Sequence, residues 1–324
     1  MRPILEVKNL STHFETQNGI VRAVDGVELT VNEGDTLGVV GESGCGKTVL
    51  ALSIMRLVPT PPGRIASGSV MFDGLDLLRL GEKEMQKVRG KDISMIFQEP
   101  MTSLNPVFRV GEQIAETIRL HQGLSRRDAL DRAIEMLRLV GIPSPEIRIR
   151  DYSHQMSGGM RQRVMIAIAL SCNPRLMLAD EPTTALDVTI QAQIIDLIND
   201  MKGKIGTSVM MITHDLAVIA ETARFVAVMY AGKIVEYGPV GDIFSASLHP
   251  YTVGLLEVIP KMNGIVGRDS YLKVIPGVVP NLHNLFRGCR FFDRCSCVMT
   301  ICWQEEPELK EKTPGHPVRC WKYA

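Results

Sequence analysis

Residues 41–48 read Gly-Glu-Ser-Gly-Cys-Gly-Lys-Thr, which is a complete phosphate-binding loop. An apolar strand-like run, 36–40, precedes the loop, and a helix-like run, 49–55, follows it. In this context the backbone N–H groups of the loop and the helix N-terminus favour the phosphates of a nucleotide. The side chains of Lys47 and Thr48 add a positive charge and a hydroxyl ligand for Mg²⁺. The residues predicted to bind phosphate and Mg²⁺ here are Gly41, Ser43, Gly44, Cys45, Gly46, Lys47 and Thr48.

A second motif lies at the end of another strand-like run. Residues 176–179 are apolar, and Asp180 and Glu181 follow them directly. In a chain with a phosphate loop, this pair predicts that Asp180 holds Mg²⁺ through water and that Glu181 polarises the attacking water. Without the loop, the same residues would indicate only a strand that ends in a polar turn.

Strand-like and helix-like segments alternate along the first 245 residues. Residues 4–40 alternate like edge strands, and 111–140 carry apolar residues at helical spacing. Residues 225–229 and 233–236 predict a hairpin with Ala231-Gly232 at its turn. We therefore predict an α/β fold with the ligand at the C-terminal ends of the strands.

The composition is that of an ordinary globular protein. Of the 324 residues, 45% are hydrophobic and 22% are charged. Lys plus Arg and Asp plus Glu number 36 each, so the charge balance gives no case for binding nucleic acid or an anionic membrane surface. The sequence has no evident secretory signal and no run of 18 apolar residues, which predicts a cytosolic chain that does not span a membrane.

The character of the chain changes near its C-terminus. Prolines punctuate residues 246–324, which we interpret as an appended unit. Most of the seven cysteines also lie there, namely Cys289, Cys295, Cys297, Cys302 and Cys320. In a cytosolic nucleotide-binding chain, such clustering suggests a metal sooner than disulfides.

Residues 157–163 read Ser-Gly-Gly-Met-Arg-Gln-Arg and precede an apolar helix, so that Ser157 is a candidate N-cap. With this stretch, the chain resembles the ATP-binding cassette (ABC) family in an ordered set of motifs: the phosphate loop, Gln98, 157–162, 176–181, 185–187 and His214. The resemblance covers nearly all of residues 4–245. It implies a nucleotide-binding domain at 1–245, with a P-loop NTPase core, an antiparallel β subdomain and a helical subdomain at about 105–165, followed by a cysteine-rich extension at 246–324.

The resemblance also implies roles for individual residues. Two cassettes pair head to tail, and each ATP lies between the phosphate loop of one and Ser157, Gly158 and Gly159 of the other. Gln98 senses Mg²⁺ and the attacking water, and His214 contacts the γ-phosphate. Phe14 stacks on adenine, and the alternative interpretation is a core residue on an edge strand.

Two features concern the dimer that the resemblance implies. Asp187, in the stretch Ala185-Leu186-Asp187, communicates between the two cassettes. Met160 stands where the family usually has glutamine, and methionine cannot make the hydrogen bonds of an amide. The contacts from Ser157 and the glycine backbone should survive this difference.

Three stretches, 97–106, 249–252 and 276–280, narrow the resemblance to importers of dipeptides and oligopeptides. The likeness implies a peripheral ATPase on the cytoplasmic face of the membrane. Its partners are a second, homologous ATPase (with a homodimer possible in isolation), two transmembrane permease subunits and an external solute-binding protein, without nucleic acid. Importers of nickel or another solute share these features and are the alternative. A soluble cassette ATPase of translation or DNA repair is less favoured, because those usually carry two cassettes or a long insertion.

The spacing of Cys289, Cys295, Cys302 and Cys320 is similar to the tail of these peptide-importer ATPases, which implies a [4Fe–4S] cluster. Zinc is the alternative, although structural zinc usually has two close pairs of ligands. Reduced cysteines could also simply fill a small core, and Cys297 is either a substitute ligand or a spectator. We expect the metal to be structural, so that serine at the four ligands unfolds the tail but leaves ATP binding intact. A redox-sensing tail is a further alternative.

Overall fold

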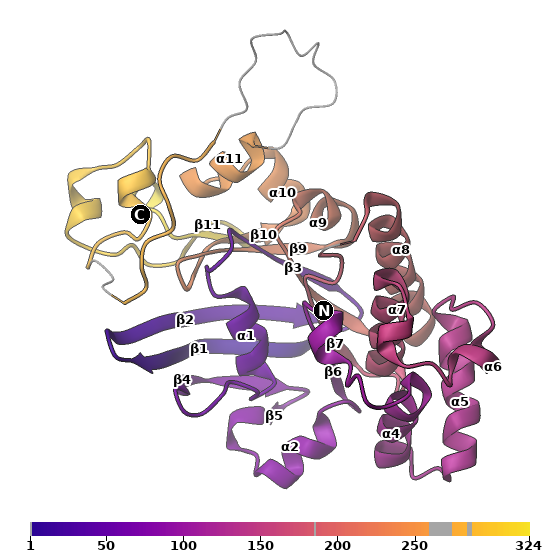
Figure 1. The fold of residues 1–324 in the computed structure, drawn as a ribbon. Coiled ribbons are helices and arrows are strands. Elements are labelled where there is room, and N and C mark those ends of the chain that lie inside the picture. The colour runs from indigo at the N-terminus through magenta and orange to yellow at the C-terminus, as the bar shows by residue number, and fades with distance from the viewer. Residues whose placement is uncertain (1, 185, 259–273, 284–286) are drawn as a thin grey trace, which may run out of the picture. The chain divides into compact units, whose positions relative to one another are not determined.

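The computed structural model describes residues 2–184, 186–258, 274–283 and 287–324 (Figure 1). The chain divides into two compact units. The first comprises Met1–Ile4, Val31–Asp35 and Asp76–Ile212, and the second comprises Leu5–Thr30, Thr36–Leu75 and Thr213–Ala324. The boundary predicted at residue 245 falls inside the second unit, where it stays a prediction.

Three parallel strands form the centre of the first unit. They lie in the order β8 (Ser208–Thr213), β7 (Leu176–Asp180), β6 (Ile93–Ile96). Every residue in them is buried. Strands that are apolar on both faces are typical of parallel sheets covered on both sides, and the sequence predicted this for β7.

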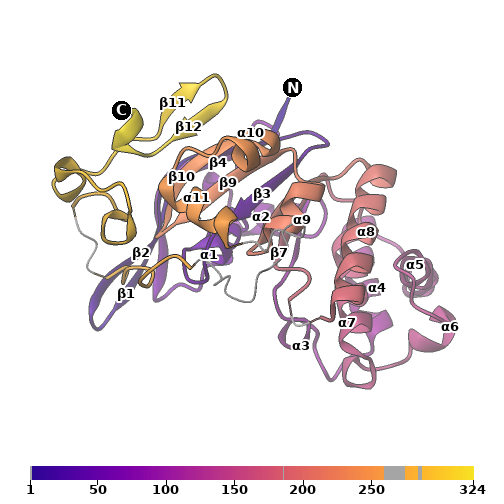
Figure 2. The ribbon, with the colours of Figure 1, turned by 90° about the horizontal axis from the view of Figure 1, so that it is seen from above.

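Helices make up most of the rest of the first unit, and Figures 1 and 2 show α7 and α8 running side by side. No helix in the described part of the chain is both long and apolar enough to cross a membrane. The helices are α2 (Glu82–Val88), α3 (Pro100–Ser103), α4 (Val110–Gln122), α5 (Arg126–Leu139), α6 (Pro145–Arg148), α7 (Gly158–Leu170) and α8 (Val188–Ile205), with 3-10 turns at Leu77–Arg79 and Ser153–Gln155.

The helical pattern predicted over 111–140 is interrupted. Gly123 takes a φ of 67° and ends α4, and the Ser125 side chain accepts a hydrogen bond from Asp128 N at the start of α5. Glycine ends helices because it tolerates the left-handed conformation, and serine is a preferred N-cap. The apolar residues at the predicted helical spacing are nevertheless buried, namely Val110, Ile114, Ile118, Ala129, Ala133 and Leu137.

The second unit contains a four-stranded sheet in the order β2 (Gly19–Asn32), β1 (Pro3–Thr16), β4 (Gly63–Phe72), β5 (Leu75–Asp76). Its strands β1 and β4 are antiparallel. The helices of this unit are α1 (Lys47–Ile54), α9 (Leu216–Thr222), α10 (Val240–Ser245) and α11 (Pro250–Glu257), and 3-10 turns lie at Phe292–Arg294, Thr300–Trp303 and Trp321–Tyr323.

The other strands of the second unit include two from the C-terminus. Their order is β11 (Lys310–Thr313), β12 (His316–Val318), β10 (Lys233–Pro239), β9 (Phe225–Tyr230), β3 (Thr36–Val40). The predicted hairpin of β9 and β10 is confirmed, with Ala231 and Gly232 both at positive φ in its turn. Residues 287–324, which we call the tail, thus contribute two strands to the sheet that contains β3, a role that the sequence did not reveal.

A buried carboxylate fastens the tail to β10. Glu236 is 0% exposed and accepts hydrogen bonds from Leu248 N at 2.7 Å and His249 N at 3.0 Å. The ring of His316, in β12, lies with its Nε2 2.7 Å from the Glu236 carboxylate. Because an unpaired buried carboxylate is costly, these contacts fix β12 and the start of α11 against β10.

This region should weaken in mild acid through His249. Burial lowers the pKa of His249 to about 3, with the positive charge of Arg319 as a smaller cause. The unfolded chain takes up this proton near pH 6.5, so the stability contributed by neutral His249 is complete above that pH and is lost as the pH falls below it. Between pH 7.5 and 5.5 we expect a loss of about 1.4 kcal/mol from this residue.

Urea unfolding of the wild type and of His249→Asn at the two pH values measures this loss. Asparagine can still accept the hydrogen bond that Tyr251 N donates to His249 Nδ1. The variant should lose less stability than the wild type between pH 7.5 and 5.5. Equal losses would show that His249 does not cause the acid sensitivity.

Candidate functional site

The phosphate loop lies between β3 and α1, as predicted. At Gly46, where φ is 105°, a Cβ atom would lie 2.1 Å from the Ala23 carbonyl oxygen. At Gly41, a Cβ atom would lie 2.1 Å from the Met229 carbonyl oxygen. No other residue type fits at either position without moving the backbone. The two glycines therefore allow the loop to pass close to β2 and β9.

Lys47 is held over this loop. Its side chain donates hydrogen bonds to the carbonyl oxygens of Gly41, at 2.7 Å, and Glu42, at 3.1 Å. A cation fixed against the loop is what the predicted phosphate contact requires. The neighbouring Cys45 is 0% exposed, and burial raises the pKa of its thiol, so the side chain is neutral and packs as an apolar group.

Two other predicted nucleotide contacts lie in the same unit as the loop. Phe14 is partly exposed on β1, opposite Gly63 of β4. His214 is exposed just before α9, and it lines a pocket together with Glu42 of the phosphate loop. The pocket thus brings His214 near the loop, whereas the stacking role of Phe14 stays a prediction.

The predicted carboxylates lie in the first unit. Asp180 is 1% exposed at the end of β7, and Glu181 follows it with a φ of 47°. Residues other than glycine seldom adopt this left-handed backbone conformation. Many of those that do so lie at functional sites. Gln98 Nε2 donates to Glu181 Oε2 at 3.0 Å, so the structure brings these two predicted residues together.

Thr184 is a further contact of Glu181 that the sequence did not reveal. Its hydroxyl donates to the same Oε2 atom at 2.8 Å. Two donors thereby orient the Glu181 carboxylate. The motif ends in two threonines, Thr183 and Thr184, but nothing in their sequence says which one turns toward the carboxylate.

The stretch 157–163 contains the start of α7. Ser157 is the N-cap of this helix, as predicted, and the Ser157 hydroxyl accepts a hydrogen bond from Met160 N at 3.4 Å. Ser157 and Gly158 are exposed, so they are accessible to a second molecule. A Cβ at Gly159 would lie 2.9 Å from the Ile190 side chain, so glycine lets α7 pack closely on α8. Asp187 caps α8 through Ile190 N, whereas Ala185 lies outside the described residues.

The four cysteines predicted to be ligands gather in the tail. Burial raises the pKa of Cys289 to about 12, and the nearby thiols of Cys302, Cys320 and Cys295 raise it further. Cys297 N donates to Cys295 Sγ at 3.3 Å. Across the described residues, however, no group of three or more His, Cys, Asp or Glu side chains is arranged to hold a single metal ion.

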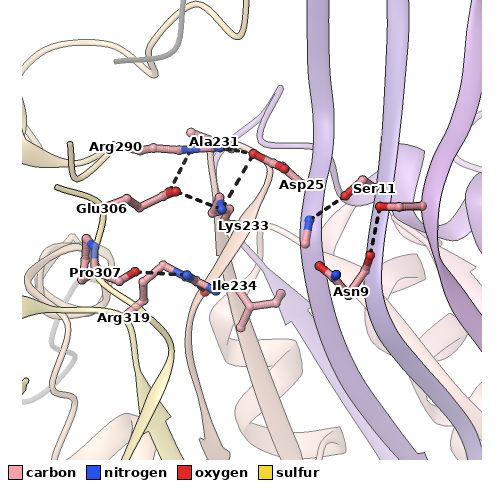
Figure 3. Close-up of polar contacts among 12 residues, drawn as sticks. Asn9, Ser11, Asp25, Ala231, Lys233, Ile234, Arg290, Glu306, Pro307 and Arg319 are labelled. Atoms are coloured by element: carbon pink, nitrogen blue, oxygen red, sulfur yellow. Dashed lines mark hydrogen bonds and ion pairs between the residues drawn. The ribbon is translucent and has the colours of Figure 1, made fainter. Parts of the chain in front are cut away.

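Charged groups attach the tail to the second unit's strands (Figure 3). Arg290 forms an ion pair with Asp25 of β2 and donates to the Ala231 carbonyl oxygen. Glu306 forms ion pairs with Arg290, at 3.2 Å from its Nε, and with Lys233, at 3.0 Å from its Nζ. This network crosses from the tail to both β2 and β10, and Arg290 is largely buried within it.

Several exposed apolar side chains follow Gln98 along the chain. Met101 is 73% exposed, Val107 71% and Phe108 55%. Val107 and Phe108 also line a pocket with Arg109 and Tyr152. A cluster of exposed apolar side chains beside a pocket is typical of a surface that binds another protein.

Residues 24–184 match the family described as ABC transporter, and residues 235–302 match the oligopeptide/dipeptide transporter C-terminal region. The chain is 53% identical, over 98% of its length and 95% of the relative's, to the probable peptide ABC transporter ATP-binding protein y4tR of Sinorhizobium fredii. It is 51% identical, over 98% of its length and 88% of the relative's, to the oligopeptide transport ATP-binding protein OppD of Bacillus subtilis.

Solved structures agree with these sequence matches. A dimeric ATP-binding cassette in a post-hydrolysis state, bound to ADP and Pi, superimposes with a TM-score of 0.66 at 27% identity. The match covers 73% of this chain and 98% of that one.

Proposed function

This chain belongs to the ABC transporter family, and on that basis we propose that it binds and hydrolyses ATP to drive the import of dipeptides or oligopeptides. The observation that carries the proposal is the combination of a complete phosphate loop with a full-length likeness to peptide transport ATP-binding proteins. The match of residues 235–302 to the oligopeptide/dipeptide transporter C-terminal region supports peptides over nickel.

The described side chains fit the chemistry of ATP hydrolysis. The phosphate loop and Lys47 bind the phosphates. Thr48 and Asp180 are the residues that would hold Mg²⁺, which supplies positive charge to the phosphate oxygens. Glu181 accepts a proton from the attacking water, and Gln98 orients both that water and the carboxylate. His214 contacts the terminal phosphate, and Phe14 stacks on the adenine.

The exposed residues at the start of α7 support a paired arrangement of cassettes. In this arrangement Ser157, Gly158 and Gly159 contact the ATP held by a second, homologous ATPase subunit, and Asp187 lies at the boundary between the two. The partner is a different chain in the whole transporter, and a homodimer forms in isolation. Two transmembrane permease subunits and an external binding protein complete the assembly, which holds this chain at the cytoplasmic face of the membrane.

The surface made by Met101, Val107 and Phe108 is our proposed contact with the permease. These exposed residues follow Gln98 closely in the chain. The side chain of Gln98 in turn donates a hydrogen bond to Glu181. A permease helix seated there would move with the residues that surround the catalytic carboxylate. This continuity along the chain supports a coupling between hydrolysis and transport.

Uptake by cells that lack this chain tests the substrate. We expect the chain, supplied in trans, to restore accumulation of radiolabelled dipeptide or oligopeptide and to leave ⁶³Ni²⁺ accumulation unchanged. An inactive Lys47→Ala variant, made at equal level, controls for expression. Restored nickel uptake without peptide uptake would identify the alternative substrate class.

For the tail we propose a [4Fe–4S] cluster on Cys289, Cys295, Cys302 and Cys320. Their mutual proximity and the N–H contact to Cys295 fit a set of thiolate ligands. The four thiols would supply one thiolate to each iron of such a cluster, whereas zinc would need its ligands around a single ion. The exposed Cys297 is a spectator in this scheme.

Metal analysis of anaerobically purified protein tests the cluster. We expect about four irons and four acid-labile sulfides per chain, with a broad visible absorption near the blue end of the spectrum. Cys295→Ser should lose the iron, whereas the matched variant Cys297→Ser should keep it. Zinc in place of iron, or no metal in the wild type, would refute the proposal without affecting the ATPase assignment.

A further inference from the structure

We propose that Arg294, in the tail, positions the phosphate loop for ATP by holding the carboxylate of Glu42. The proposal rests on the function proposed above and adds a residue that its motifs do not contain. Arg294 Nη1 donates to Glu42 Oε2 at 2.7 Å, and Nη2 donates to Oε1 at 2.9 Å. This two-fold contact joins residues that are 252 positions apart in the sequence.

The guanidinium itself is tightly placed. Its side chain is only 2% exposed. Arg294 Nε donates to the Pro276 carbonyl oxygen at 2.8 Å, and Nη1 also reaches the Tyr230 hydroxyl at 3.3 Å. The group lies near the rings of Tyr230 and Phe291, which are both buried. A planar, forked cation held on several sides can fix a carboxylate in one orientation.

Glu42 links Arg294 to the loop, because both its backbone N–H and its carbonyl oxygen form hydrogen bonds. Glu42 N donates to the hydroxyl of the buried Tyr251 at 2.8 Å, and Glu42 O accepts from Lys47 Nζ at 3.1 Å. Cys45 N also donates to Glu42 O, at 3.3 Å. Glu42, which Arg294 holds, therefore also accepts the hydrogen bonds of Cys45 N in the loop and of the Lys47 side chain.

The tail does not depend on Arg294 for its attachment. The network of Arg290, Asp25, Lys233 and Glu306 fastens it to β2 and β10 separately (Figure 3). The Glu236–His316 contact fastens β12 as well. Loss of Arg294 should therefore loosen the loop while the tail stays in place. This coupling differs from the expectation that the tail and ATP binding are independent.

MgATP binding to the full-length chain, measured by calorimetry, tests the proposal. Arg294→Gln should weaken binding about tenfold or more, because it removes one partner of a buried ion pair. In turnover, KM for ATP should rise while kcat changes much less. Arg294→Lys should recover only part of the affinity, since an ammonium cannot make the forked contact. Arg287→Gln changes an exposed arginine of the tail outside these contacts and should bind ATP as the wild type does.

The coupling is tested by a second variant on the loop side. Glu42→Gln should weaken MgATP binding as Arg294→Gln does, and the double variant should be no weaker than either single one. Additive losses, or unchanged binding in Arg294→Gln, would overturn the proposal. If Arg294→Gln does not fold, Glu42→Gln decides alone, because it leaves the tail sequence intact. A wild type that fails to bind ATP would instead refute the proposed function.

Discussion

Replacing Glu181 with glutamine should reduce ATP turnover by about 10²–10⁴-fold, the usual contribution of a general base. An amide cannot take the proton from water, whereas its size and shape match those of the carboxylate. The donors from Gln98 and Thr184 can still meet its oxygen, so the local structure should persist. ATP binding should be retained or tightened, and the variant should accumulate as an ATP-bound dimer.

Single-turnover hydrolysis of radiolabelled MgATP, together with size-exclusion chromatography, measures both effects. Thr184→Ala is a useful control, because it removes one of the two donors to Oε2 but keeps the base. It should slow turnover much less than Glu181→Gln does. If Glu181→Gln hydrolyses ATP at the wild-type rate, another group takes the proton and the assignment of Glu181 is wrong.

Placing a charge on the exposed apolar surface should abolish peptide uptake while ATP binding survives. In Phe108→Asp, a carboxylate would have to be buried under the permease without a partner, which is strongly unfavourable. Phe108 is 55% exposed in this chain, so the variant should fold normally. The expected result is uptake at the level of cells without the chain, with unchanged affinity of the purified variant for MgATP.

Leu120→Asp is the matched control for this surface. Leu120 is 73% exposed on α4, but it does not line the pocket next to Phe108. Its variant should support normal uptake. Equal loss in both variants would point to a general defect, and normal uptake in Phe108→Asp would remove this surface from the permease contact. Co-purification of permease subunits with each variant gives an independent readout.

The motif residues could be recognised in the sequence because their spacing is local. A phosphate loop needs its glycines, lysine and threonine at fixed spacing, so 41–48 identified it without other information. Gln98 and Glu181 were each picked out by the family motifs, but their hydrogen bond was found only in the structure. The interruption between α4 and α5 was also local, at Gly123 and Ser125, but the strong helical spacing on both sides hid it.

The contacts made by the tail could not be predicted in this way. Arg294 lies in a cysteine-rich segment where the thiols dominate the pattern, and its partner is a loop residue far away in the sequence. Strands β11 and β12 are short, and β11 is entirely exposed, so neither has a hydrophobic pattern that reveals its neighbours. These strands join β10 through the buried contact between Glu236 and His316. A contact between residues so far apart cannot be recognised from the sequence alone.

The position of β12 also bears on how the protein is made. A ribosome releases the chain from its N-terminus, so β3 and the phosphate loop emerge long before residues 316–318. The strands of the second unit cannot reach their final order until residues 310–318 have been synthesised. A nascent chain or a fragment clipped before the tail lacks both β12 and the arginine that holds Glu42. Assembly of this sheet therefore has to wait for the synthesis of β12.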